Sequence, residues 1–439
     1  MGVLTQIAGL LLSLSILVIL HEIGHFIFAR IFKTRVEKFY LFFNPWFSLF
    51  KYKKGETEYG IGWLPLGGYV KIAGMIDESL DKEQMKKPPQ PYEFRSKPAW
   101  QRLMIMLGGV VVNFILALFI YAMILFTWGE EFLRARDVKY GYDFHPYARE
   151  VGFRDGDIII KIDNTNIEDY LDIVPRLLVH DATSVTVLRD GREQNIRLPD
   201  DFSQQVIGRE IRNLLSIRVP FVIDSIIPGK IAAAAGFMKN DSIVAFNGVP
   251  TPFYNEFDKI KNENLGKEVE VTVGREGKLV ALQFTLPDDG FIGIGNKPYD
   301  HFFSINRIQY GFLASIPAGI NLGVKTLVFY VKQLKLLFSP AGARQLGGFG
   351  TIGSLFPKKW DWNRFWNMTA FLSVILAFMN ILPIPALDGG HVMFILYEIA
   401  AGRKPGDKFM EYAQLTGMLI LLGLLIFANG NDIVRLFTR

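Results

Sequence analysis

Three residues that could bind and activate a metal ion interrupt an apolar stretch near the N-terminus. The segment SILVILHEIGHFIFAR, residues 15–30, contains an H-E-x-x-H motif. On a helix, His21 and His25 lie one turn apart on the same face, where both imidazoles can reach one zinc ion. Glu22 follows the first histidine and can act as general base toward the water that such a metal activates. This pattern predicts a metal-dependent hydrolase.

The apolar surroundings strengthen this interpretation. An ionised side chain at the centre of a membrane helix costs roughly 2.5–3.5 kcal/mol, so such residues are rare and usually functional. The alternative is a helix end, where the three polar side chains only reach the lipid headgroups.

A second polar group follows helix-breaking residues near the C-terminus, in NILPIPALDGGH, residues 380–391. Asp388 is the only acidic residue there and follows 23 uncharged positions. Catalytic zinc needs a third protein ligand and an open position for water. We predict that Asp388 is this ligand, because an aspartate in lipid needs a strong partner. His391 is the competing candidate.

The residues before Asp388 predict an opened backbone. Pro383 and Pro385 cannot continue a helix, and irregular backbone at membrane depth is tolerated only where it lines protein or a water-filled cavity. The functional interpretation is that this backbone and the Asn380 amide hydrogen-bond an unwound substrate. The alternative is that these residues only kink the helix.

Composition indicates a membrane protein. Of the 439 residues, 50% are hydrophobic, and the mean hydropathy is +0.22. The formal net charge is +5, but Lys and Arg are scattered, so a basic membrane-facing surface explains the excess better than nucleic acid does. The absence of Cys excludes disulfides and thiolate chemistry.

Four uncharged stretches are long enough to span a bilayer: 1–20, 103–129, 365–387 and 412–431. The first lacks a basic segment and a cleavage site, so we expect a retained helix. The two intervening loops, 30–102 and 401–411, carry basic residues close to the spans, and the positive-inside rule places these loops in the cytoplasm. The segment 130–364 is therefore expected outside. Within it, residues 308–338 carry Lys325, Lys332 and Lys335 on one helical face, which is typical of an interfacial helix.

We therefore predict a polytopic α-helical membrane protein with about four transmembrane helices, a membrane-associated β-hairpin loop and two tandem α+β domains. The expected organisation is a first transmembrane helix with HExxH (1–30), a cytoplasmic loop with the hairpin (31–102), a second transmembrane helix (103–129), two repeated domains (130–215 and 216–290), an extracytoplasmic interfacial region (291–364), a third transmembrane segment (365–400), a cytoplasmic loop (401–411) and a fourth transmembrane helix (412–432). A short β-hairpin or sheet is expected within 56–72, and a flexible connector within 77–98.

The outer segment contains an internal repeat. VGFRDGDIIIKIDNTNIEDY from Val151 aligns with AGFMKNDSIVAFNGVPTPFY from Ala235, at an offset of 84 residues. Five matched pairs carry the alignment: Gly152/Gly236, Phe153/Phe237, Asp157/Asp241, Ile159/Ile243 and Asp163/Asn247. Each copy resembles a PDZ domain, a fold that binds chain termini or extended segments by strand addition. The alternative is a pair of rigid spacers.

Taken together, these motifs resemble the site-2 protease family, specifically its RseP-type intramembrane zinc metalloproteases of Gram-negative bacteria. The resemblance rests on HExxH in the first span, GGYVK in the loop, tandem PDZ-like domains and NxxPxPxLDGGH in the penultimate span. It implies Zn²⁺ held by His21, His25 and Asp388, with Glu22 as the catalytic base. It also implies a substrate path along Asn380, Pro383 and Pro385, and a strand edge in 59–72 that includes Gly67, Gly68 and Tyr69.

The same resemblance implies the cellular context. Substrates would be single-pass membrane proteins, such as trimmed anti-sigma factors and remnant signal peptides, and the chain, expected to be a monomer, would lie in the inner membrane with the PDZ-like domains in the periplasm. One departure is GGVVVNF in the second span, where the family often has Gly-Pro before the Asn, which leaves the role of Asn113 open.

Two rival functions remain at this level. A membrane-anchored zincin that cleaves soluble chains would take a Glu ligand from a soluble helix, which LDGG inside a span argues against. A non-enzymatic PDZ scaffold would have no need for Glu22. By chain order the PDZ-like pair is expected to act as a size gate for substrates, and the alternative is that it recruits newly exposed C-termini.

Overall fold

The computed structural model describes residues 2–65, 67–75, 88–179, 182–209, 211, 213–337 and 346–437. Much of the predicted 77–98 connector lies outside the described residues. The chain divides into two compact units. Unit 1 comprises Met1–Gly129 and Gln309–Arg439, and unit 2 comprises Glu130–Ile308.

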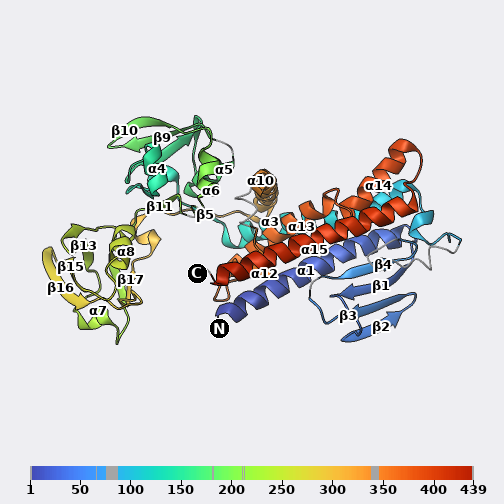
Figure 1. Cartoon of the computed structure of the whole chain (residues 1–439), viewed down its shortest axis with the longest axis horizontal. Coiled ribbons are helices and arrows are strands. Elements are labelled where there is room, and N and C mark those ends of the chain that lie inside the picture. Colours follow the sequence, from blue (N-terminus) through green and yellow to red (C-terminus); the bar gives the residue numbers. More distant parts are fainter. Residues whose placement is uncertain are drawn as a thin grey trace. The chain divides into compact units, whose positions relative to one another are not determined.

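Unit 1 is built mainly of long helices (Figure 1). They are α1 (Gly2–Ile31), α3 (Ala99–Trp128), α10 (Phe312–Leu337), α12 (Phe349–Ser354), α13 (Trp362–Ile381), α14 (Asp388–Ala401) and α15 (Asp407–Phe437). Helix α3 is central and packs against α1, α10, α13 and α14. The backbones of α1 and α3 come close where Gly24 faces Gly108, because neither residue has a side chain to separate them.

Within the part of the chain that the structure describes, five helices are long and apolar enough to cross a membrane: α1, α3, α10, α13 and α15. Four of them overlap the predicted spans, and α10 overlaps the predicted interfacial segment. Figure 1 shows α10 end-on, whereas α1, α13 and α15 run along the picture, so α10 crosses these helices. Its Gly319 packs against Ala122, while Ile316, Ile320 and Val324 form an exposed apolar stripe. Such a helix can lie along a membrane surface with this stripe in the acyl region.

The predicted third transmembrane segment is two helices with a break between them. Helix α13 ends at Ile381 and α14 begins at Asp388, so the prediction of an opened backbone at Pro383 and Pro385 is confirmed. Ala386 has a φ of 78°, a left-handed conformation that non-glycine residues seldom adopt. This sharp turn places Asp388 in the first turn of α14.

Residues 56–72 do not form a hairpin of their own, and the alternative of a sheet is confirmed. The sheet has four strands, β1 (Val36–Leu41), β2 (Phe50–Lys54), β3 (Thr57–Ile61) and β4 (Tyr69–Ile72), in the order β2-β3-β1-β4. Strands β3 and β4 are separated by β1, which pairs with β3 in parallel and with β4 antiparallel. The tight hairpin is β2–β3 instead. Strand β4 is an edge strand.

Unit 2 contains two copies of one fold, and strand β5 (Glu130–Phe132) at its start pairs with β18 (Asn306–Ile308) at its end. The first copy consists of β6 (Tyr142–Phe144), α4 (Pro146–Val151), β7 (Ile158–Ile162), β8 (Thr165–Asn166), α5 (Ile173–Val179), β9 (Ser184–Arg189), β10 (Arg192–Arg197), α6 (Phe202–Gly208) and β11 (Leu215–Ile217). The second consists of β12 (Ile223–Ile226), α7 (Ile231–Ala234), β13 (Ser242–Phe246), β14 (Val249–Pro250), α8 (Tyr254–Asn262), β15 (Glu268–Arg275), β16 (Lys278–Thr285) and β17 (Ile294–Asn296), followed by α9 (Tyr299–Phe302).

The two copies have matching sheets. The order β10-β9-β7-β8 in the first corresponds to β16-β15-β13-β14 in the second, and the pair β6–β11 corresponds to β12–β17. Each copy is closed by a strand that follows its long hairpin. For this reason β11 crosses the expected boundary at 215, and β17 lies beyond the expected end at 290.

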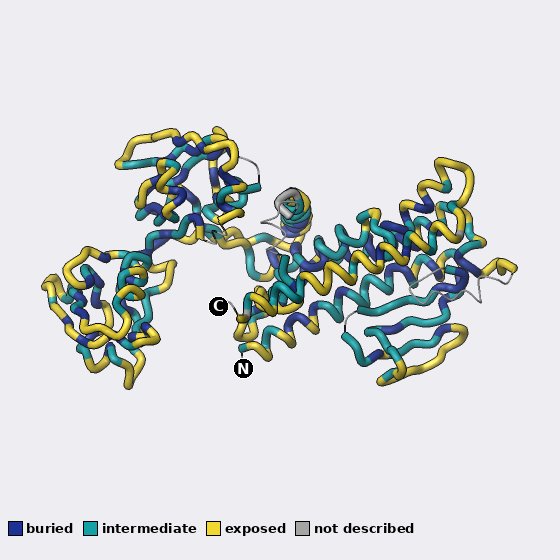
Figure 2. The backbone as a smooth tube through the Cα atoms, viewed as in Figure 1, coloured by how far each residue is buried: buried dark blue, intermediate teal, exposed yellow. Residues whose placement is uncertain are grey.

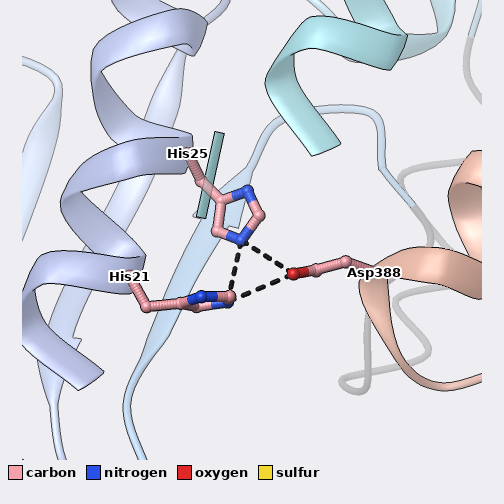
Figure 3. Close-up of side chains that lie close together, drawn as sticks. All are labelled: His21, His25 and Asp388. Atoms are coloured by element: carbon pink, nitrogen blue, oxygen red, sulfur yellow. Dashed lines mark hydrogen bonds and ion pairs between the residues drawn. The ribbon is translucent and has the colours of Figure 1, made fainter. Parts of the chain in front are cut away.

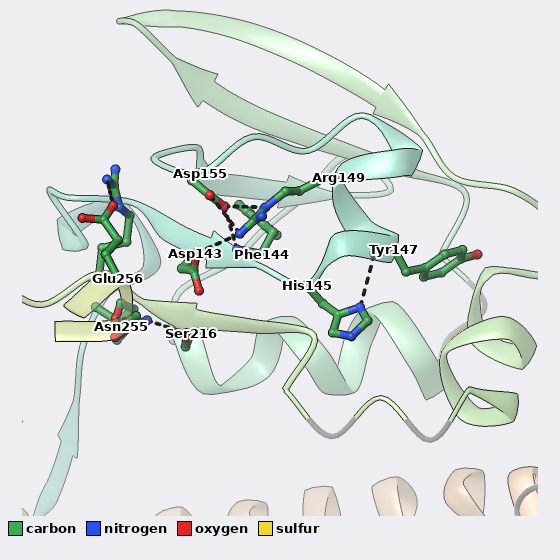
Figure 4. A network of polar contacts seen from close by, with 11 residues as sticks. Asp143, Phe144, His145, Tyr147, Arg149, Asp155, Ser216, Asn255 and Glu256 are labelled. Carbon is green, nitrogen blue, oxygen red and sulfur yellow. Dashed lines mark hydrogen bonds and ion pairs between the residues drawn. The ribbon is translucent and has the colours of Figure 1, made fainter. Parts of the chain in front are cut away.

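The copies are also joined to each other by polar contacts. Asn255 of α8 donates a hydrogen bond to the Ser216 hydroxyl in β11, 2.7 Å away (Figure 4). Arg218, directly after β11, forms a 2.8 Å ion pair with Glu256. These contacts fix the start of α8 against the last strand of the first copy.

Candidate active site

Three side chains from opposite ends of the chain meet in unit 1 (Figure 3). His21 and His25 project from α1, and Asp388 projects from the first turn of α14. The two Nε2 atoms are 3.1 Å apart, and Asp388 Oδ2 lies 3.2 Å from His21 Nε2 and 3.4 Å from His25 Nε2. Helical pitch brings the histidines together, and the break after α13 brings the aspartate to them.

This arrangement fits a zinc ion. A tetrahedral ion with bonds of about 2.0 Å holds its ligand atoms about 3.3 Å apart, close to the three separations here. Asp388 Oδ2 is buried and has no hydrogen-bond partner, a costly state that a cation would relieve. Two imidazoles and one carboxylate also form a donor set that zinc prefers, and three protein ligands leave the fourth position open for water.

Helix α3 supports the histidines. The Ile105 carbonyl accepts a 2.8 Å hydrogen bond from His25 Nδ1, which leaves the Nε2 lone pair directed at Asp388 and the proposed metal position. Gly109 faces both rings: a Cβ there would lie 2.5 Å from His21 Cε1 and 2.5 Å from His25 Nε2. A glycine is therefore required where α3 passes the imidazoles.

Glu22 lies beside the ligands and contacts the sheet. Its carboxylate lies near the backbone N–H of Val70 in β4, and both residues line the same cavity. Val70 lies opposite Phe39, whose backbone groups face β3 because the carbonyl of Leu41, two residues on, accepts a hydrogen bond from Gly62; the Val70 N–H therefore points away from β1, to the free edge. Gly68 fits tightly here, because a Cβ would lie 2.7 Å from the Tyr40 carbonyl oxygen and 2.8 Å from Val18. The free edge of β4 thus lies beside the Glu22 side chain.

A cavity of about 490 Å³ contains the three candidate ligands and Glu22. Residues 68–72 form one wall, and Asn380, residues 386–388, His391 and Gln414 lie on other sides. The lining is mixed polar and apolar, as is usual for a ligand site.

The predicted site residues divide into those inside this cavity and those outside it. Gly68, Tyr69 and Asn380 line it, and Asn380 Nδ2 lies 3.4 Å from His21 Nε2. Gly67 lies outside the lining, beside Phe43. The same holds for the prolines of the break: Pro383 is exposed and the Pro385 carbonyl packs against Gly417 of α15.

His391 lies in the cavity but away from the cluster. Its Nε2 is 3.5 Å from the Gln414 amide nitrogen of α15. Among the described residues, the group close enough to share one ion is His21, His25 and Asp388. The structure therefore favours Asp388 over His391 as the third ligand.

Sequence reasoning missed the supporting groups on α3. The sequence alone indicates no role for Gly109 or the Ile105 carbonyl, and it leaves the role of Asn113 open. The Asn113 amide nitrogen lies 3.3 Å from His21 Nδ1. Small residues beside an amide within an apolar stretch, as in GGVVVNF, were the available signal.

Comparisons with known proteins agree with this site. The family model described as "Peptidase family M50" matches residues 9–424. "Metalloprotease MmpA" of Caulobacter vibrioides is 28% identical, and the alignment covers 99% of this chain and 96% of that protein. "Regulator of sigma-E protease RseP" of Escherichia coli is also 28% identical, over 99% of both chains. The Salmonella typhimurium protein of the same name is 27% identical over 99% of this chain and all of its own length.

Proposed function

The chain belongs to peptidase family M50 and is a zinc metalloendopeptidase, and from this premise we propose that it cleaves transmembrane segments of single-pass membrane proteins. The observation that carries the proposal is the cluster of His21, His25 and Asp388 beside Glu22, in a cavity walled by the free edge of β4. The cluster joins a helix long enough to span a membrane to a break at the end of another such helix.

The residues have distinct roles in this proposal. His21, His25 and Asp388 would hold zinc, which when bound lowers the pKa of its water and polarises the scissile carbonyl. Glu22 accepts the proton that the attacking water loses and then donates a proton to the leaving nitrogen. The amide of Asn380, across the cavity from β4, is placed to donate a hydrogen bond to substrate.

The edge of β4 gives the substrate a binding mode. A helical segment hides its carbonyls in i→i−4 hydrogen bonds and must unwind before hydrolysis. Each unpaired polar group in an apolar environment is costly, so an extended chain gains most from pairing with another strand. Strand β4 offers backbone donors and acceptors on its free side, next to Glu22. We propose that Gly68 and Tyr69 belong to this binding edge.

Among single-pass membrane proteins, we propose two narrower classes of substrate. The relative from Escherichia coli is named a regulator of sigma-E protease, which supports trimmed anti-sigma factors as one class and remnant signal peptides as another. The basic residues of the loops between spans support an inner-membrane orientation with the active site toward the cytoplasm and unit 2 in the periplasm.

Two PDZ-like domains inserted between spans could exclude substrates with bulky ectodomains. Deleting residues 135–288 would then allow cleavage of untrimmed substrates, whereas loss of cleavage of trimmed ones would indicate recruitment.

A direct test uses the full chain purified in detergent and loaded with zinc. It is incubated with a panel of single-span reporters and with soluble unfolded proteins. We expect cleavage within the membrane segment of trimmed reporters, mapped by mass spectrometry of the products. The matched Glu22→Gln protein should produce none. Cleavage confined to soluble chains would contradict the proposal.

A further inference from the structure

Asn113 is a buried amide with an unexplained oxygen. It lies on α3, one turn beyond Gly109, and is 1% exposed. Its Nδ2 is 3.3 Å from His21 Nδ1, while its Oδ1 is buried without a hydrogen-bond partner. The Asn113 backbone is held as well, because its carbonyl accepts a 2.7 Å hydrogen bond from the Ser373 hydroxyl of α13. An amide with an unpaired oxygen inside an apolar helix bundle carries a free-energy cost, which indicates a specific role.

A comparison of His21 with His25 explains the buried Asn113 amide. An imidazole that binds a metal through Nε2 carries its proton on Nδ1, and that proton needs an acceptor. His25 has one, since its Nδ1 faces the Ile105 carbonyl. At His21 Nδ1, the polar group within hydrogen-bonding distance is the Asn113 amide.

The orientation of the amide follows from this proton. A protonated Nδ1 facing the amide NH₂ would set two donors against each other. A half-turn about the Cβ–Cγ bond brings Oδ1 to the ring and makes it the acceptor of Nδ1–H. That exchange gives the buried oxygen a hydrogen bond and directs the Nε2 lone pair of His21 toward the metal.

We propose that Asn113 is a positioning residue for zinc binding, which fixes the tautomer and ring orientation of His21 through Oδ1. Ile105 does the same for His25 through its backbone, so one helix orients both imidazoles. This inference rests on the proposed ligand set. It predicts that the oxygen of residue 113 matters and that the amide nitrogen does not.

The test measures zinc retention of the full chain in detergent against graded concentrations of a chelator. Asn113→Leu keeps the approximate volume and removes the acceptor, and loss of such a supporting hydrogen bond typically weakens metal binding about 10–100-fold. Asn113→Asp keeps an acceptor oxygen and should retain zinc nearly as the unmodified protein does. If Asn113→Leu does not fold, Asn113→Ala replaces it, because it removes the oxygen without adding volume.

Two further variants distinguish a failure of this inference from a failure of the proposed ligand set. Asn367→Leu removes an amide of α13 that donates to Asn363, and its zinc affinity should be unchanged. His25→Ala should lose zinc; retention there would refute the ligand set itself. With that set intact, the inference is overturned if Asn113→Leu retains zinc like the unmodified protein, or if Asn113→Asp loses it as Asn113→Leu does.

Discussion

Buried aspartates differ between the two units. In unit 2, Asp157 and Asp241 are each 1% exposed and each meets an arginine, Arg189 or Arg275, through two hydrogen bonds of 2.7–2.8 Å. Each also accepts a backbone N–H, from Arg154 and Met238 respectively. In unit 1, Asp388 faces two imidazole nitrogens, and its Oδ2 has no hydrogen-bond partner.

The difference separates a structural carboxylate from a functional one. The aspartates of unit 2 are satisfied within their own domain, and the recurrence of the same contact in both copies reflects a shared fold. Asp388 Oδ2 is buried without a hydrogen bond, so its burial carries a free-energy cost that a bound cation would offset. An unsatisfied buried carboxylate near two imidazoles therefore indicates a metal site, and a fully paired one does not.

The largest effect is expected from Asp388→Ala. Removing one of three ligands should lower zinc content and proteolysis together, to the level of a blank. The zinc content of purified protein and the cleavage of a single-span reporter measure this. His391→Ala is the matched control within the same cavity. If His391→Ala loses zinc while Asp388→Ala keeps it, the assignment of the third ligand is wrong.

Glu22→Gln should separate catalysis from metal binding. The variant loses the general base but keeps all three ligands, so zinc content should stay unchanged while turnover falls about 10²–10⁴-fold, the usual worth of a positioned base. Reporter cleavage and metal analysis on the same preparation test this. Retained turnover would mean that another group activates the water.

The candidate ligands could be predicted because their signals are local. The spacing of His21 and His25 follows from helical pitch, and the position of Asp388 follows from the prolines that end α13. The internal repeat could be predicted from the sequence in the same way, because each copy is formed by one continuous stretch of the chain. These parts needed no knowledge of how distant segments pack.

The sheet and the support from α3 could not be predicted in this way. Strands β3 and β4 are consecutive, but β1 is inserted between them, and such long-range pairing leaves no local signal. The rotation of α3 about its axis decides that Gly109 and Asn113 face the histidines. That rotation is set by packing against α1, α10 and α13 together, where apolar residues cover most of the helix surface.

A moderate effect, confined to unit 2, is expected from Arg275→Met. It leaves the buried Asp241 carboxylate without its cation, which typically costs about 3–5 kcal/mol of stability. Hydrogen exchange of β13 and β15 amides, followed by mass spectrometry in the full chain, should show faster opening. Arg189→Met should do the same for β7 and β9. Zinc content should stay unchanged in both; a drop would show that the two units are energetically coupled.

The smallest effect concerns a pair of equivalent residues that differ in charge. Asp163 and Asn247 occupy the same turn of the two copies, with φ of 46° and 45°. Partial burial opposes ionisation of Asp163, but hydrogen bonds from Thr183 and Ser184 outweigh it and lower the pKa of this carboxylate. Asn247 Oδ1 instead accepts from the Glu270 N–H and has no charge to lose.

The sign of the pH dependence follows from that lowered pKa. A carboxylate with a lowered pKa in the folded state stabilises it above the unfolded pKa of about 3.9, and this contribution is lost as the pH falls below that value. The effect should be small, because Asp163 is largely exposed and solvent screens it. Hydrogen exchange of the first copy between pH 6 and pH 3 should therefore show a modest acid loss that Asp163→Asn removes. Asn247→Asp should introduce the same loss into the second copy, and its absence there would show that the turn does not select for the charged form.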